Sequence, residues 1–335
     1  MQLQAGPHRY EWQADWAQIP PTESSRRGWA HPGMAVDKTG HILTFHQGDP
    51  RLLVFNPDGS LVRSVDTNLT EGHGLTLVEE VGVEYLWIAD SGGKRDPAQN
   101  YDRGTAKPAG QVVKMTLDGQ IVQTIGAPDL PIYKEGAFSP TGVIVDEERF
   151  GGTGDVWITD GYAQNQIHQF EKGGQLLNSI TGEEGAAGAF KTPHGIWFDR
   201  RKSETELYIA DRASHRIQVY DLTGKYKRTF GSEVLSSPCC LAADGDLLVV
   251  AELRSRLALF DVQDQFIGHL GDNSPVADQP GWPNQLDPAG NPSRTTRLEP
   301  GKFNSPHGMT VDQQGNIYVA EWLIGGRYDK LTKVA

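Results

Sequence analysis

Short runs of alternating hydrophobic and polar residues recur along the whole chain, and turns rich in Asp and Gly separate them. Side chains in a β-strand point alternately to opposite faces of a sheet, so this pattern predicts short strands. Expected strands include residues 51–55, 166–170, 216–220 and 257–260, each of which runs into a turn. The pattern therefore predicts an all-β protein.

The same strand–turn–strand pattern occurs six times. Its clearest copies are SPHGMTVDQQGNIYVAEW (305–322), TPHGIWFDRRKSETELYIADR (192–212), SPTGVIVDEERFGGTGDVWITDGY (139–162) and HPGMAVDKTGHILTFHQGD (31–49), and the weaker ones are EGHGLTLVEEVGVEYLWIADSG (71–92) and SPCCLAADGDLLVVAELRSR (237–256). A period of about 40 to 50 residues is typical of propeller blades. We therefore expect a six-bladed β-propeller, with a single domain over residues 1–335.

Two intervals between copies are long and hold insertions, at residues 92–109 and 272–301. Both insertions are polar and contain Gly and Pro, so we expect loops over one face, where loops commonly form the walls of a substrate site. After Glu321 the chain has room for only one more strand, near residues 328–334, whereas residues 10–16 alternate near the other end. We expect this N-terminal strand to complete the last blade.

Composition narrows the function classes. The formal net charge is −12, which disfavours a nucleic-acid or anionic-membrane surface, because both require clustered positive charge. The chain has two cysteines, Cys239 and Cys240. Because they are adjacent, they rarely meet the geometry of a disulfide with each other. The start, MQLQAGPHRYEW, lacks the pattern of a secretory leader, and no apolar run approaches a membrane span. We expect a cytoplasmic protein with a small-molecule or peptide-like substrate; oligomeric state is left open.

One position of the repeat is rich in histidine. The residue before the repeat's glycine is, in order, Pro32, His73, Thr141, His194, Cys239 and His307. Equivalent residues of alternate blades stand about 120° apart around the axis of a six-bladed propeller, so His73, His194 and His307 would converge. Three imidazoles with an open fourth position suit a catalytic Zn²⁺ or another divalent transition metal ion. A lone histidine in such a turn is more often a hydrogen-bonded turn residue, and the recurrence favours the metal site.

A second position of the repeat ends the second strand and holds His46, Asp90, Asp160, Asp211, Glu252 and Glu321. For most of these carboxylates we favour a structural role, because they can accept backbone N–H bonds from the following turn. Better site candidates come directly afterwards: Gln47, Tyr162 and Arg212. By themselves Tyr162 and Arg212 would be an aromatic residue at a blade rim and a salt-bridged surface residue, but a neighbouring metal site favours functional roles.

These residues resemble the peptidyl-α-hydroxyglycine α-amidating lyase (peptidylamidoglycolate lyase) family, whose fold is a six-bladed propeller with an axial zinc ion. The resemblance spans nearly the whole chain and is sharpest in FHQGD (45–49), GHGLTL (72–77), DGYAQNQIHQF (160–170), TPHGIWF (192–198) and IADRASHRIQVY (209–220). It implies that His73, His194 and His307 bind zinc, that Tyr162 is the catalytic tyrosine and that Arg212 is an active-site arginine. The implied reaction splits the C–N bond of a peptidyl α-hydroxyglycine into an amide and glyoxylate.

The chain departs from this family at several positions. Gln47 stands where the family has an arginine, so Gln47 and Arg51, four residues later, are the candidate substrate-binding residues. Gly308 stands where the family has a calcium-binding aspartate, although the backbone carbonyls of Met34 and Leu75 remain candidate calcium ligands. The family's disulfide cysteines are replaced, in agreement with an intracellular location; the residues here are Ala163, Tyr208 and Val219.

Two other functions stay open at this point. The same scaffold could carry a metal-dependent hydrolase in which bound hydroxide attacks a lactone or ester. It could also be a non-catalytic NHL-type platform for binding partners, which would not need three histidines on its axis. The C–N lyase is the function that the combined motifs favour.

Overall fold

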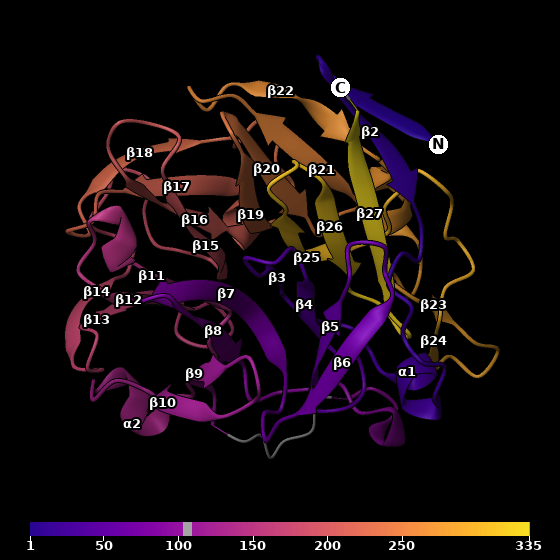
Figure 1. Cartoon of the computed structure of the whole chain (residues 1–335), viewed down its shortest axis with the longest axis horizontal. Coiled ribbons are helices and arrows are strands. Elements are labelled where there is room, and N and C mark those ends of the chain that lie inside the picture. Colours follow the sequence, from indigo (N-terminus) through magenta and orange to yellow (C-terminus); the bar gives the residue numbers. More distant parts are fainter. Residues whose placement is uncertain (103–108, 335) are drawn as a thin grey trace. The chain divides into compact units, whose positions relative to one another are not determined.

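The computed structural model describes residues 1–102 and 109–334, and β-strands make up most of the regular structure in this part of the chain. Six antiparallel sheets of four or five strands follow one another along the sequence, which is the six-bladed β-propeller fold that the repeat predicts (Figure 1). Within the described ranges, no helix is long and apolar enough to cross a membrane.

Residue contacts group the chain into two compact units, which are described separately below. The first unit is Met1–Asn68, Lys94–Lys107 and Ala242–Ala335, and the second is Leu69–Gly93 and Pro108–Leu241. The expectation of a single domain over residues 1–335 stays a prediction.

The first unit contains the first and last blades and most of the fifth. Its strands are β3 (Met34–Val36), β4 (Ile42–Phe45), β5 (Arg51–Phe55) and β6 (Leu61–Asp66) in the first blade; β20 (Leu247–Glu252), β21 (Arg256–Phe260) and β22 (Phe266–Leu270) in the fifth, whose strand β19 (Pro238–Asp244) contains the unit boundary; and β25 (Pro306–Val311), β26 (Ile317–Glu321) and β27 (Arg327–Val334) in the last. Outside the blades lie α1 (Glu23–Arg27), η1 (Pro97–Gln99), η4 (Ser274–Asp278) and the small hairpin of β23 (Gln285–Leu286) and β24 (Pro292–Ser293).

The N-terminal segment completes the last blade, as predicted. Strand β2 (His8–Gln13) pairs with β27, and β1 (Gln2–Ala5) adds an outer strand that the sequence pattern did not reveal, so that both termini lie at one sheet (Figure 1). The pairing ends before the expected residue 16 because Asp15 adopts a left-handed conformation with φ of 48°. Trp16 then turns into the core, where its ring packs against Phe55 and Tyr318.

The second unit contains the second, third and fourth blades. Their strands are β7 (Gly72–Glu80), β8 (Val83–Asp90), β9 (Gln111–Thr116) and β10 (Ile121–Ile125); β11 (Gly142–Val145), β12 (Val156–Asp160), β13 (Gln166–Phe170) and β14 (Leu176–Ile180); and β15 (Pro193–Asp199), β16 (Glu206–Asp211), β17 (Arg216–Tyr220) and β18 (Tyr226–Phe230). Short helical segments join them: α2 (Ile132–Glu135), η2 (Glu148–Phe150) and η3 (Arg212–Ser214). Buried side chains from adjacent sheets pack into shared clusters, for example Trp87, Val143 and Ile158.

The glycine of the repeat marks a close approach between neighbouring innermost strands. A Cβ atom added at Gly74 on β7 would lie 2.6 Å from the carbonyl oxygen of Thr141, and one added at Gly195 on β15 would lie 2.6 Å from the carbonyl oxygen of Cys239. No side chain fits at such distances, so glycine is required at these positions. The same approach places a backbone carbonyl of the neighbouring strand next to the histidine that precedes each glycine. The carbonyl of Thr141 lies beside His73, and that of Cys239 lies beside His194.

Residues 103–108 of the first insertion lie outside the described residues. The rest of both insertions forms loops, as predicted, with short helical turns and one small hairpin. The two insertions meet within the first unit, where the Asn100 side chain donates a hydrogen bond of 3.0 Å to the side chain of Asn291. Segments that are distant in sequence therefore build one surface together.

Candidate functional site

Two of the predicted ligands, His73 on β7 and His194 on β15, lie side by side in the second unit. Their rings are buried and their centroids are 4.8 Å apart. Nδ1 of His73 lies 2.6 Å from the carbonyl oxygen of Thr141, and Nδ1 of His194 lies 2.8 Å from that of Cys239. A carbonyl oxygen only accepts, so Nδ1 carries the proton and Nε2 presents a lone pair. Metal-binding histidines are commonly oriented in this way.

Tyr162 places its hydroxyl group between these two lone pairs. The hydroxyl oxygen is 3.1 Å from Nε2 of His73 and 3.0 Å from Nε2 of His194. Its single proton can serve only one of the two nitrogens, so the other nitrogen faces an oxygen lone pair. A positive charge among these three atoms, from an added proton or a metal ion, removes that repulsion. The arrangement therefore suits a cation.

Arg212, the first residue of η3, contacts Tyr162 from another side. Its Nη1 donates to the Tyr162 hydroxyl at 3.3 Å, and its guanidinium carbon lies 5.2 Å from the centroid of the tyrosine ring. The backbone N–H of Arg212 donates to the carbonyl of Thr192 at 3.1 Å, which ties η3 to the start of β15. A guanidinium at this position stabilises negative charge on the phenol oxygen or on a bound carboxylate. The second unit thus brings together four of the predicted site residues, His73, Tyr162, His194 and Arg212.

A buried carboxylate fixes the turn that carries Tyr162. Asp160, at the end of β12, accepts backbone N–H bonds from Ser139 at 2.7 Å and from Gln164 at 2.9 Å, and a bond from the Tyr133 hydroxyl at 2.7 Å. Burial raises the pKa of the Asp160 carboxyl, while these hydrogen bonds act in the opposite direction. The structural role expected for this position of the repeat is confirmed at Asp160.

The first unit brings together a second pair of buried histidines, His307 on β25 and His31 just before β3. Their ring centroids are 4.3 Å apart, and the ring of Trp322 lies 6.0 Å from that of His31. The repeat alignment missed His31 because Pro32 occupies the aligned position, one residue later. The signal was the motif HPG itself, which has its histidine shifted by one residue relative to the PHG of residues 193–195 and 306–308.

The two candidate substrate-binding residues lie in the first blade with other partners. Gln47 is buried, and its side-chain N–H donates to the carbonyl of Ser25 at 2.8 Å. Arg51 forms an ion pair of 2.8 Å with Asp66, on the neighbouring strand β6. Their roles in substrate binding stay predictions.

The candidate calcium ligands lie on innermost strands. Met34 is paired with Thr44 between β3 and β4, and Leu75 with Ile88 between β7 and β8. A Cβ atom added at Gly308 would lie 2.1 Å from the carbonyl oxygen of Pro32, so this position has no room for the aspartate of the lyase family. Calcium binding through the carbonyls of Met34 and Leu75 stays a prediction.

The chain is similar in sequence to NHL repeat-containing proteins. It is 28% identical over 308 residues to NHL repeat-containing protein 3 of Homo sapiens, a match that covers 86% of this chain and 75% of the relative. It is also 25% identical over 215 residues to the probable peptidyl-alpha-hydroxyglycine alpha-amidating lyase pgal-1 of Caenorhabditis elegans, covering 56% of this chain and 54% of the relative. No protein-family model matches the chain.

Solved structures support the propeller fold over nearly the whole chain. A streptogramin B lyase structure has a TM-score of 0.59 and 14% identity, covering 99% of this chain and 100% of the other. A gluconolactonase from Xanthomonas campestris has a TM-score of 0.59 and 16% identity, covering 99% of both chains. At this level of identity the likeness concerns the fold alone, and function depends on the site.

Proposed function

We propose that the protein is a metal-dependent lyase that cleaves the C–N bond of a carbinolamide-type substrate and releases an amide and glyoxylate or a related carbonyl compound. One observation carries the proposal: the Tyr162 hydroxyl lies between the Nε2 atoms of His73 and His194, while both Nδ1 atoms are held by backbone carbonyls. Two directed imidazole donors and a phenol in direct contact combine the parts for metal binding and proton transfer.

In this proposal His73, His194 and His307 hold one divalent transition metal ion, Zn²⁺ or a similar ion, with His31 next to His307. Neutral imidazoles fit such ions well, and the tethered Nδ1 atoms of His73 and His194 fit ligands that bind through Nε2. The ion would lower the pKa of a hydroxyl group bound to it.

Tyr162 and Arg212 would then handle the proton and the charge. The Tyr162 oxygen, as phenolate, accepts the proton of the substrate hydroxyl, and Arg212 stabilises the phenolate at 3.3 Å before the transfer. As the hydroxyl oxygen becomes a carbonyl, the C–N bond breaks and its electron pair leaves with the amide nitrogen. That nitrogen takes up a proton, which Tyr162 can return, so the cycle consumes no water.

A second candidate, a metal-dependent hydrolase of lactones or esters, is favoured by one observation. The position where the lyase family has an arginine is Gln47, and its amide is bonded to the backbone carbonyl of Ser25. A substrate with a carboxylate would find no arginine to pair with at this position, whereas a neutral lactone would not need one. The similarity to pgal-1 and the contact between Tyr162 and Arg212 favour the lyase.

Metal content separates either enzyme from a non-catalytic platform. Protein purified without chelator is measured by elemental mass spectrometry, together with His194→Ala and a control, His8→Ala, which alters a histidine on β2 in the first unit. We expect about one transition metal ion per chain in the wild type and in His8→Ala, and a large loss in His194→Ala. A metal-free wild type after reconstitution with Zn²⁺, Mn²⁺ or Fe²⁺ would refute the proposal.

The reaction is then tested directly on the metal-loaded protein. Glyoxylate release from N-acyl-α-hydroxyglycines supports the lyase, and acid release from γ- and δ-lactones without glyoxylate supports the hydrolase. Turnover that persists unchanged in Tyr162→Phe would contradict the roles assigned above.

A further inference from the structure

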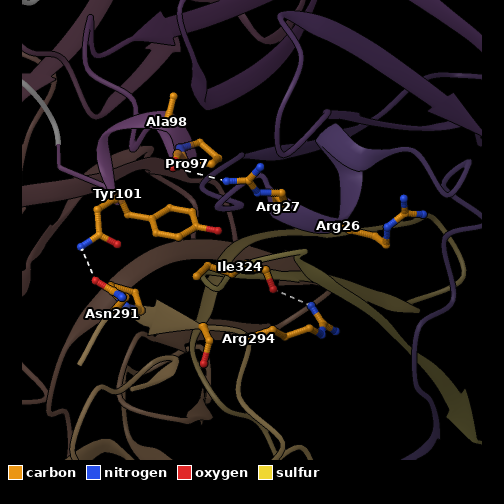
Figure 2. A pocket seen from close by; sticks show the side chains of 11 residues that line it. Arg26, Arg27, Pro97, Ala98, Tyr101, Asn291, Arg294 and Ile324 are labelled. Atoms are coloured by element: carbon orange, nitrogen blue, oxygen red, sulfur yellow. Dashed lines mark hydrogen bonds between the residues drawn. The ribbon is translucent and has the colours of Figure 1, made fainter. Parts of the chain in front are cut away.

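The first unit contains a cavity of about 640 Å³ that the proposed reaction does not use. Its walls come from α1, from both insertions and from the loop after β26 (Figure 2). The hydrogen bond between Asn100 and Asn291 joins the two insertions at its edge. Residues that are far apart in sequence thus converge on one hollow, as expected of a built binding site.

The lining of this cavity is positively charged. Arg26, Arg27 and Arg294 line it, and none of the described lining residues is an aspartate or glutamate. Arg27 is paired with Glu23 at 3.0 Å, but both side chains are more than half exposed, so this pair is weak. The cavity therefore presents guanidinium groups that an anion could engage.

Arg294 is the least exposed cation of the cavity. Its Nη1 donates to the backbone carbonyls of Ile324 at 2.6 Å and Gly326 at 2.7 Å, and it forms no ion pair with any residue that the structure describes. Burial lowers the pKa of the Arg294 guanidinium. The hydrogen bonds of this guanidinium go to neutral carbonyls, and the carboxylates of Asp15, Glu321 and Asp329 act on it without forming an ion pair, so a ligand anion can still pair with it directly.

The loop after β26 is shaped to hold this arginine. Gly325 has a φ of 75°, and a Cβ atom added there would lie 2.7 Å from Nη1 of Arg294. Gly326 has a φ of 59°. Both conformations favour glycine, and the loop presents the carbonyls of Ile324 and Gly326, on either side of Gly325, to the guanidinium. Arg294 is therefore oriented before any ligand arrives, which lowers the cost of binding.

Part of the remaining wall is aromatic and apolar. The Tyr101 ring packs edge-on against Trp29, with centroids 5.6 Å apart, and Ile324 belongs to the same buried cluster. Figure 2 shows the Tyr101 hydroxyl and the Arg27 side chain directed toward each other across the cavity, with Ile324 and Arg294 on the facing side. Apolar surface next to fixed cations suits an amphipathic ligand.

We propose that this cavity binds a small organic anion, whose acidic group meets Arg294 and Arg27 and whose apolar or planar part lies against Tyr101 and Ile324. The acidic group is an oxyacid, a carboxylate or a phosphate ester, because both match the planar fork of a guanidinium. The site goes beyond the proposed reaction, since it requires neither the metal ion nor Tyr162.

Calorimetric titration of the full chain with benzoate, phenyl phosphate and neutral benzamide tests the inference. We expect one or both anions to bind at least about tenfold more tightly than benzamide, and the better anion identifies the acidic group. Arg294→Gln and Arg27→Gln should each weaken binding of the anion by about tenfold, whereas the control Arg9→Gln, at an exposed residue of β2, should leave the affinity unchanged. Arg27 is exposed on α1, so its variant keeps the test valid if Arg294→Gln fails to fold.

Three results would overturn the inference: equal affinity for benzamide and the anions, equal weakening in Arg9→Gln, or no binding of either anion. His194→Ala separates this site from the proposed reaction. Anion affinity that survives in that variant supports a distinct site whether or not the lyase proposal holds. Anion affinity that disappears with the metal would assign the anion to the metal centre and refute the cavity site.

Discussion

Replacing Gly161 by alanine tests whether the turn that carries Tyr162 is held in place by close packing. Gly161 lies between Asp160 and Tyr162, and a Cβ atom added there would be 2.1 Å from the carbonyl oxygen of Pro193 and 2.8 Å from Oγ1 of Thr141. Ordinary contact of a Cβ atom begins near 3.4 Å. Either the turn or the Pro193 backbone must therefore move by roughly 1 Å. A shift of the turn displaces Tyr162, and a shift of Pro193 displaces His194, which directly follows it.

The expected cost follows from this displacement. Overpacking of a buried site typically costs about 1–3 kcal/mol of folding free energy. A shift of about 1 Å in catalytic geometry can lower turnover by about 100-fold. We therefore expect Gly161→Ala to fold with reduced stability, to bind the metal ion more weakly and to lose most of its activity, although it removes no functional group.

The assay is urea unfolding, metal titration and glyoxylate release for three proteins: wild type, Gly161→Ala and Gly126→Ala. Gly126 is the matched control because a Cβ atom added there meets nothing within 4 Å. If Gly161→Ala matches Gly126→Ala in stability, metal affinity and turnover, the turn is not held by packing against Pro193 and the reasoning is wrong. A loss of stability and metal affinity without measurable turnover in the wild type would confirm the packing and refute the lyase.

Two further predictions concern a proton and a charge. Tyr162→Phe should keep the metal ion but lower kcat by about 10²–10⁴-fold, since it removes a general acid–base group; an equal fall in metal content would instead make Tyr162 a ligand or a structural residue. Burial alone would raise the pKa of Glu206, but hydrogen bonds from Arg228 and Lys227 lower it to about 2. A carboxyl group whose pKa is lower in the folded than in the unfolded protein stabilises the fold at a pH above its unfolded pKa, near 4.5. This contribution, at most about 3 kcal/mol, should disappear as the pH falls from about 4.5 to 2. Urea unfolding of Glu206→Gln against the exposed control Glu204→Gln measures it, and a difference that persists at pH 2 would contradict the assignment.

The strands could be predicted from the sequence because their determinants are local and repeated. Residues 51–55, 166–170 and 216–220 were expected as strands and are β5, β13 and β17 with the same bounds. The outer strand β1 was not expected, since four residues joined by a tight turn at Gly6 give too short a pattern. Turn geometry, rather than hydrophobicity, also ended β2 earlier than expected.

The site was predictable only where the repeat carried it. His73 and His194 occupy one repeated position and Tyr162 closely follows the other, and the structure brings them within hydrogen-bond distance. The alignment did not identify His31, because this histidine lies one residue before the repeated position. The contact between the rings of His31 and His307 is visible only in the structure. The cavity around Arg294 could not be predicted, because both insertions that build it lie outside the repeat.

The alternation of histidine and other residues at the repeated position has a physical basis in the second unit. His73 and His194 do not orient themselves: their Nδ1 atoms bond to the carbonyl oxygens of Thr141 and Cys239, which are the equivalent residues of the next blades. Thr141 also bonds through Oγ1 to the carbonyl of Pro193, directly before His194, at 2.9 Å. Thr141 thus holds the histidine of one blade with its backbone carbonyl and the strand of another blade with its side chain. Blades with and without an imidazole are therefore parts of one support, and the histidines depend on the residues between them for their tautomer and direction.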